Sequence, residues 1–300
     1  MAKVFLIRTE DRKQGIHHLC EAAGPQYSGK DVVVKANYNS ADPFPASTHS
    51  DTLISLIQEI RGRGPRTVTL VERSGMGNTR HVLERCKVYD NLVPLGVDIV
   101  VLDNLPAREW SHIPGEKMHW KNGFFVPKRL LQAGAVVQSC CLKTHRFGGH
   151  FTLSLKNSVG VVAKTVPGST YNYMHELHSS SFQRLMIAEI NQAYPVDLVI
   201  MDALEGFVRG GPEDGDRVAP GLLLAGNDRV AIDAVGVAIL RSFGSTPEVM
   251  GGPIFSLEQI ARAAELGIGV SGPEAITPIP LNDESRPDAE QLTAILEGEP

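Results

Sequence analysis

The chain of 300 residues has few cysteines, no excess of positive charge and no long hydrophobic run. Its four cysteines form no C-x-x-C pair, so we expect no iron–sulfur cluster, which needs about four closely spaced thiolates. No apolar run reaches the ~18 residues of a membrane span, and no signal peptide is visible. A formal net charge of −5 argues against broad binding to nucleic acid or anionic membranes. These absences predict a cytoplasmic protein that binds neither.

Motifs for metals and nucleotides are also missing. The ten histidines include no H-E-x-x-H pair. The turn Glu72–Gly77 is rich in glycine but matches neither phosphate-binding fingerprint, and an ordinary turn is the simpler interpretation. Adjacent Cys140 and Cys141 are interpreted as buried free thiols. No cofactor is identified, and a divalent metal held by acidic side chains stays open.

Short apolar runs alternate with stretches of helical spacing along most of the chain. Strands are expected at residues 4–7, 31–34, 67–71, 98–102, 135–139, 197–201 and 221–225. Helices are expected at residues 11–23, 48–61, 78–86, 128–133, 181–193, 228–242 and 254–266. This alternation predicts an α/β fold, with a mostly parallel sheet covered by helices on both faces.

The expected organisation is a single α/β unit over residues 1–300. Two lobes around a central cleft, at about 1–130 and 131–270, are an open alternative. Residues 103–123 interrupt the alternation and hold both tryptophans, so they are predicted either to cover the pocket as a lid or to pack as a surface excursion. The segment 271–300 is rich in Pro, Glu and Asp and is predicted to be irregular.

Basic side chains follow two of the predicted strands, where ligands bind in folds of this kind. Lys35 and Asn37 follow residues 31–34, and Lys143 and His145 follow residues 135–139. The latter two are two residues apart, so they share a face in an extended segment. Lys156 lies in an apolar stretch, where it must find a partner or reach solvent, and a buried lysine of lowered pKa can act as a base or nucleophile. Lys143, His145 and Lys156 are the catalytic candidates.

Acidic side chains follow the strand expected at residues 197–201. Asp202 and Glu205 could tune the lysines or hold a metal. Asp228 is a natural N-cap, whereas Asp233 lies inside an apolar helix and needs a partner, for which one of the lysines is the candidate. The candidate substrate-binding residues are Lys35, Asn37, Asn157, Asp202, Glu205 and Asp233.

Five segments, in this order along the chain, resemble the domain of unknown function family 362. They are Val32–Asn37, Leu142–His145, Leu155–Gly160, Asp202–Gly206 with Gly211-Pro212, and Ala225–Ala234. Many members of that family carry a ferredoxin-like module, which is not visible here. The family's usual Lys-Pro-Asn is Lys35-Ala36-Asn37, and its Pro-Lys ahead of Lys-Thr-His is Cys140-Cys141. The resemblance implies a site at these residues, with one family lysine missing.

Several functions stay open. The first is an enzyme that acts on a small carboxylate or phosphate in a cleft lined by Lys and His. The others are a non-catalytic binding or electron-transfer adaptor and a purely structural network of charges. A fainter similarity to nickel-pincer lactate racemase, from His145 through Lys156 to Pro167-Gly168, adds a racemase or epimerase as a remote alternative. The sequence does not indicate the reaction type, the substrate's identity or the oligomeric state.

Overall fold

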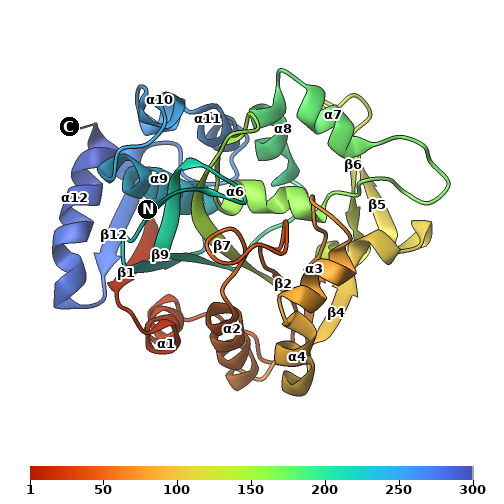
Figure 1. The fold of residues 1–300 in the computed structure, drawn as a ribbon, viewed down its shortest axis with the longest axis horizontal. Helices are drawn as coiled ribbons and strands as arrows, with labels where there is room; N and C mark the ends of the chain where they lie inside the picture. Colours follow the sequence, from red (N-terminus) through yellow and green to blue (C-terminus); the bar gives the residue numbers. More distant parts are fainter. Residues whose placement is uncertain (299–300) are drawn as a thin grey trace.

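The alternating pattern folds into a central sheet with helices on both faces (Figure 1). The structure is a computed structural model that describes residues 1–298, and the sheet in this part of the chain has ten strands. The order along its main path is β12-β1-β11-β9-β7-β2-β3-β4, while β10 pairs with β9 and β8 with β7. On the main path within the described residues, β11 alone runs opposite to the other strands. The predicted α/β fold with a mostly parallel sheet is confirmed.

The bounds of the elements follow the expected order closely. The strands are β1 Ala2–Arg8, β2 Asp31–Lys35, β3 Thr67–Glu72, β4 Asp98–Val101, β5 Trp110–Ile113, β6 Phe124–Pro127, β7 Ala135–His145, β8 His150–Thr152, β9 Leu198–Gly210, β10 Gly215–Val218, β11 Leu222–Gly226 and β12 Ile276–Pro280. The helices are α1 Arg12–Ala23, α2 Ser50–Gly62, α3 Thr79–Arg85, α4 Val88–Leu92, α5 Lys128–Leu131, α6 Ser154–Asn157, α7 Tyr173–Ser179, α8 Gln183–Ile190, α9 Arg229–Ser242, α10 Pro247–Met250, α11 Glu258–Glu265 and α12 Arg286–Glu297.

Apolar side chains on successive residues of the central strands enter two different cores. In β11, Leu222 and Leu224 pack in the cluster that contains α9, whereas Leu223 and Ala225 pack in the cluster that contains α1 and α2. Figure 1 shows these helices on opposite sides of the sheet. Strands covered on both faces read as continuous apolar runs, which is the pattern that predicted them.

Local signals end and begin helices as expected. Gly24 adopts a left-handed conformation with φ of 60° and caps α1. The Asp228 side chain accepts a hydrogen bond from the Ala231 N–H, which confirms it as the N-cap of α9. Strands β7 and β9 continue beyond the apolar runs that predicted them. Their polar ends stay extended because the antiparallel strands β8 and β10 supply backbone pairing partners there.

The prediction of an irregular C-terminal segment is wrong for residues 271–298. Strand β12 pairs in parallel with β1, and α12 follows it. The strand escapes sequence analysis because it contains Pro278 and Pro280, which are tolerated at a sheet edge, where one side of the strand needs no partner. Residues 299 and 300 of the predicted segment lie outside the described residues.

The interruption at residues 103–123 contributes strand β5 to a separate two-stranded antiparallel sheet with β6. Trp110 and Trp120 are buried in a third apolar cluster, which also contains residues of α7 and α8. The main sheet is continuous across residue 130, since β2 pairs with β7. The division into two lobes stays a prediction.

The structure also bears on membrane insertion. Within residues 1–298, the helices are too short or too polar to cross a membrane.

Candidate functional site

A cavity of about 510 Å³ opens at the carboxyl ends of β2, β3 and β7. Ligands bind at this edge in α/β folds. Six of the nine predicted site residues line the cavity together: Lys35, Asn37, Lys143, His145, Lys156 and Asn157. Lys143 and His145 reach it from β7, and Lys156 and Asn157 reach it from the short helix α6.

The charge of Lys35 is neutralised by the neighbouring carboxylate of Glu72. Its Nζ is 2.6 Å from Oε1 of Glu72 at the end of β3, and it also donates to Oδ1 of Asn157 at 3.3 Å. Both charged side chains are buried, and burial lowers the pKa of Lys35 and raises that of Glu72. A Cβ on Gly160 would lie 2.9 Å from this Nζ, so the glycine makes room for the lysine tip.

Lys143 is buried and held by backbone. Its Nζ donates to the carbonyl oxygens of Ala46 and, at 3.3 Å, Pro45, which belong to the loop after β2. Among the described residues, no carboxylate oxygen lies within 4.0 Å of it. Burial lowers the pKa of Lys143. The side chain therefore ties the loop after β2 to β7, and no carboxylate among the described residues pairs with it.

Lys156 is left without a partner in the part of the chain that the structure describes. No hydrogen bond or ion pair there involves its Nζ, although the residue is largely buried and lines the cavity. Burial, with Lys143 and Arg73 nearby, lowers its pKa to about 7. Near neutral pH a large fraction of this amine is therefore uncharged.

His145 lies beside Lys156. A Cβ built on Gly149 would be 2.6 Å from Cε of Lys156 and 3.0 Å from Nδ1 of His145, so both side chains crowd this glycine. Burial, together with Lys156 and Lys143, holds the pKa of His145 far below its ordinary value. The imidazole is neutral at physiological pH.

Arg73 is a cavity residue that sequence analysis missed. It follows β3, is buried, and donates from Nε to the Val162 carbonyl at 2.9 Å and from Nη2 to the Val159 carbonyl at 2.7 Å. Within residues 1–298 its guanidinium has no carboxylate partner within 4.0 Å, although its backbone N–H donates to Oε1 of Glu72 at 2.9 Å. The signal was its place directly after a strand, but the glycines beyond it favoured an ordinary turn. The other missed lining residues include Glu72, Thr152, Lys164, His175 and His178.

Four polar atoms in the cavity lining are buried and lack a hydrogen-bond partner among the described residues. They are Nδ2 of Asn37, Oε2 of Glu72, Nδ1 of His145 and Oγ1 of Thr152. Buried polar atoms are nearly always paired. This set offers both donors and acceptors to a polar molecule in the cavity.

The three acidic candidates lie outside the cavity lining. Asp202 pairs with Nε of Arg12 at 2.8 Å, and Glu205 pairs with Arg217 at 3.2 Å. The expected lysine partner of Asp233 is wrong. Its carboxylate accepts hydrogen bonds from the backbone N–H groups of Ser154 at 2.7 Å and Leu155 at 3.1 Å. Asp233 thus anchors the start of the helix that carries Lys156.

The prediction that residues 103–123 cover the cavity as a lid is also wrong. Residues 103–123, all of which the structure describes, contribute nothing to the cavity lining, which includes Lys164, Asn172, Met174 and His178 instead. The tryptophans appeared costly to leave in water, and the structure resolves this by burying them among α7 and α8. The packed surface excursion was the correct alternative.

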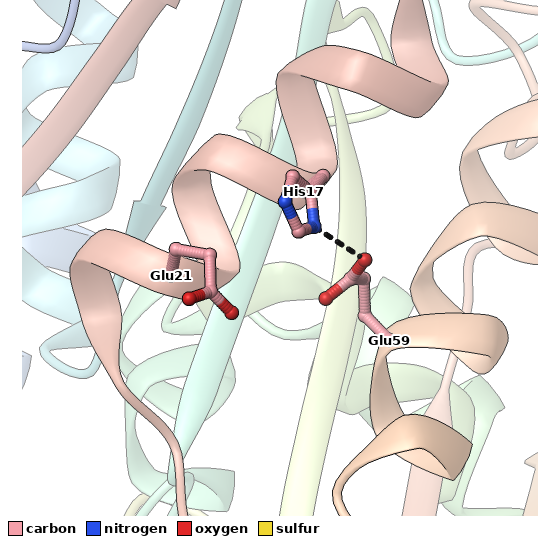
Figure 2. A group of neighbouring side chains, drawn as sticks. All are labelled: His17, Glu21 and Glu59. Carbon is pink, nitrogen blue, oxygen red and sulfur yellow. Dashed lines mark hydrogen bonds and ion pairs between the residues drawn. The ribbon is translucent and has the colours of Figure 1, made fainter.

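One group in residues 1–298 has the spacing of metal ligands. Figure 2 shows His17 and Glu21 on α1 facing Glu59 on α2, and one ligand atom from each lies within 4.8 Å of the others. Arg63 pairs with Glu21 at 2.7 Å and with Glu59 at 2.6 Å, so both carboxylates already have a cation. The group does not line the cavity.

Comparisons with known proteins agree with the sequence resemblance. A family model described as Domain of unknown function (DUF362) matches residues 32–238, which contain every residue of the cavity lining. A crystal structure of a protein from Thermotoga maritima, determined by the Northeast Structural Genomics Consortium, aligns with 73% of this chain at 13% identity and a TM-score of 0.44. This chain covers 55% of that protein. None of the curated proteins matches.

Proposed function

The chain belongs to the family described as domain of unknown function DUF362, and we propose that it binds and acts on a small anionic metabolite in the cavity lined by Lys and His. The charge balance of the lining carries this proposal. Five Lys and Arg side chains (Lys35, Arg73, Lys143, Lys156 and Lys164) face one carboxylate, that of Glu72. This excess is local, because the whole chain has a net charge of −5.

The excess remains after the internal pairing is counted. Glu72 neutralises Lys35, which leaves the side-chain nitrogens of Lys143, Lys156 and Arg73 without a carboxylate within 4.0 Å in the described part of the chain. A buried charge without a partner is costly. A carboxylate or phosphate group on a ligand would supply the missing negative charge.

One feature favours chemistry over binding alone. Lys156 has a pKa of about 7, so its amine can gain or lose a proton near physiological pH, beside a His145 imidazole that burial keeps neutral. The cavity volume of about 510 Å³ is within the range of small-molecule sites. A non-catalytic binding module would use the same cavity and would bind the anion without turning it over.

A thermal-shift series tests the anion site. Phosphate, acetate and citrate are compared with the uncharged acetamide and glycerol at equal ionic strength. An anion present at 100 times its Kd should stabilise the wild-type protein by ~2.7 kcal/mol. The stabilisation should fall in Lys156→Met and persist in Lys13→Met, which removes an exposed lysine on α1.

Two results would count against the site. One is an absence of any anion-dependent shift in the wild type. The other is an equal shift in wild type and Lys156→Met, which would place the anion elsewhere on the molecule.

A further inference from the structure

We propose that Lys156 is an amine nucleophile that forms a Schiff base with a 2-oxo acid bound in the cavity. This inference rests on the proposed anion site and specifies its substrate class: a carboxylate with an adjacent carbonyl group. Three observations carry it: an amine nitrogen without a partner among the described residues, two basic side chains of the same cavity without a carboxylate partner, and the His145 imidazole beside the amine.

The bonding of the cavity lysines distinguishes Lys156 from the others. Lys35 is committed to Glu72 and Asn157, and Lys143 to two backbone carbonyl oxygens. Lys164 is exposed to solvent at the rim of the cavity and is not part of its buried wall. Lys156 combines a place in the cavity wall with an Nζ that bonds to none of the described residues. A nucleophilic amine needs this combination, because a bonded or protonated nitrogen has no free lone pair.

The neighbouring cations serve two purposes. Burial lowers the pKa of Lys156 most, and the nearby Lys143 and Arg73 lower it further. The same two charges lack carboxylate partners within 4.0 Å in residues 1–298, so they can hold the carboxylate of a ligand. A carbonyl carbon bonded directly to that carboxylate would then lie close to the Lys156 nitrogen. This geometry favours a 2-oxo acid over an aldehyde without an acidic group.

The step needs proton transfer and no oxidant or reductant. Nζ of neutral Lys156 attacks the carbonyl carbon, and a C–N bond forms as the C–O π pair moves to oxygen. That oxygen takes up a proton, and the nitrogen gives one up, which yields a carbinolamine. A second proton reaches the hydroxyl group, water leaves and the iminium ion remains. Solvent water exchanges these protons, and the buried Nδ1 of the neighbouring His145, which lacks a partner among the described residues, is available to hydrogen-bond the carbinolamine.

Reductive trapping tests the proposal on the intact chain. The protein is incubated with pyruvate or 2-oxoglutarate and sodium cyanoborohydride, with propionate and glutarate as matched acids that lack the carbonyl group. Trapping by an oxo acid should add its mass less one oxygen atom, and peptide mapping should place the adduct on Lys156. Adduct yield should fall at least about tenfold in Lys156→Met and stay unchanged in Lys13→Met, which removes an exposed lysine on α1 outside the cavity.

The outcomes separate the two proposals. A thermal shift with both oxo acids and their matched acids, without an adduct on Lys156, overturns the Schiff base and leaves the anion site standing. An adduct spread over surface lysines and equal in Lys156→Met overturns the Schiff base as well. No thermal shift and no adduct overturns both. Mapping in the wild type keeps the test valid even where a variant folds poorly.

Discussion

Gly149 and Gly160 decide where two of the cavity lysines can lie. Each is a position at which a Cβ would approach the end of a lysine side chain below 3.0 Å, at Lys156 and Lys35 respectively. Neither glycine has a positive φ, so backbone conformation does not require them. Their role is to leave space, and this is a property that a substitution can test directly.

Gly149→Ala should displace Lys156 while the protein stays folded. The clash falls on Cε of a flexible side chain, which can move at little cost, but the amine and His145 lose their relative placement. We expect anion binding to weaken on the order of tenfold, which corresponds to about 1.4 kcal/mol. Thermal-shift titration with phosphate measures this. Gly62→Ala is the control, because nothing lies within 4 Å of its new methyl group. Equal affinities in the two variants would refute the role of Gly149.

Asp233 makes stability depend on pH. Burial raises its pKa from 3.8 to about 7, so between these values the folded state holds a proton that the unfolded state has released. The stabilisation by this group is therefore complete below pH ~4 and is lost as pH rises to ~7. Relative to Asp233→Asn, which cannot titrate, the wild-type protein should lose up to roughly 1.4 kcal/mol for each pH unit across this window.

Urea denaturation at several pH values between about 4 and 8 measures this difference. Asp216→Asn is the control, since Asp216 is exposed and its variant should follow the wild-type profile. Parallel profiles for wild type and Asp233→Asn would show that Asp233 is not the group responsible.

At the scale of elements, the cavity is lined by residues of the segment 164–178 and not by the β5–β6 pair. Lys164, Asn172, Met174, His175 and His178 line it, and residues 164–170 are mostly exposed apart from the buried Val166. The Trp120 indole instead donates to the Met186 carbonyl at 3.2 Å, inside the third apolar cluster. Ligand binding should therefore change the protease sensitivity of the segment 164–178 and leave that of the β5–β6 pair unchanged.

Limited proteolysis with and without saturating phosphate should show slower cleavage within 164–172 and unchanged cleavage within 103–123. The latter segment serves as the internal reference. Tryptophan emission should also stay constant, because Trp110 and Trp120 do not line the cavity. If the ligand protected residues 103–123 from cleavage and left 164–172 unprotected, the result would support the lid that the sequence predicted at residues 103–123.

The sequence predicted helices and strands well where apolar runs define them, and less well where specific hydrogen bonds to other parts of the chain define them. Strand β2 and helix α9 appear within one residue of their expected bounds, since burial on both faces fixes their composition. Helix α7 was missed because its seven residues include two histidines and a serine, and its start depends on the Asn172 side chain, which accepts from His175 N–H. In the site, the rule of strand ends found Lys35 and Lys143. It could not show that Asp233 bonds to backbone, because that contact depends on how α6 meets α9.

At the scale of the whole molecule, one sheet joins the two halves of the chain. The pairing of β2 with β7 crosses the proposed boundary near residue 130, and the cavity lining takes residues from both sides of it. We therefore expect a single cooperative unfolding transition in calorimetry, with equal calorimetric and van't Hoff enthalpies. Saturating phosphate should move this transition as a unit. Two resolved transitions, of which phosphate shifts one, would instead support two independent lobes.

The anchoring of Lys143 by the carbonyl oxygens of Pro45 and Ala46 has a consequence for how this cavity can diversify. A carbonyl oxygen is present whatever the side chain, so the contact places little demand on the identity of the loop residues. Asn37 and Asn39 of the same loop line the cavity, whereas Tyr38 between them is buried in the core beside α2. Random mutagenesis of Asn37 and Asn39, with Tyr38 kept, should thus yield folded variants with new ligand preferences in which Lys143 keeps its backbone contacts, so this loop is a suitable starting point for directed evolution.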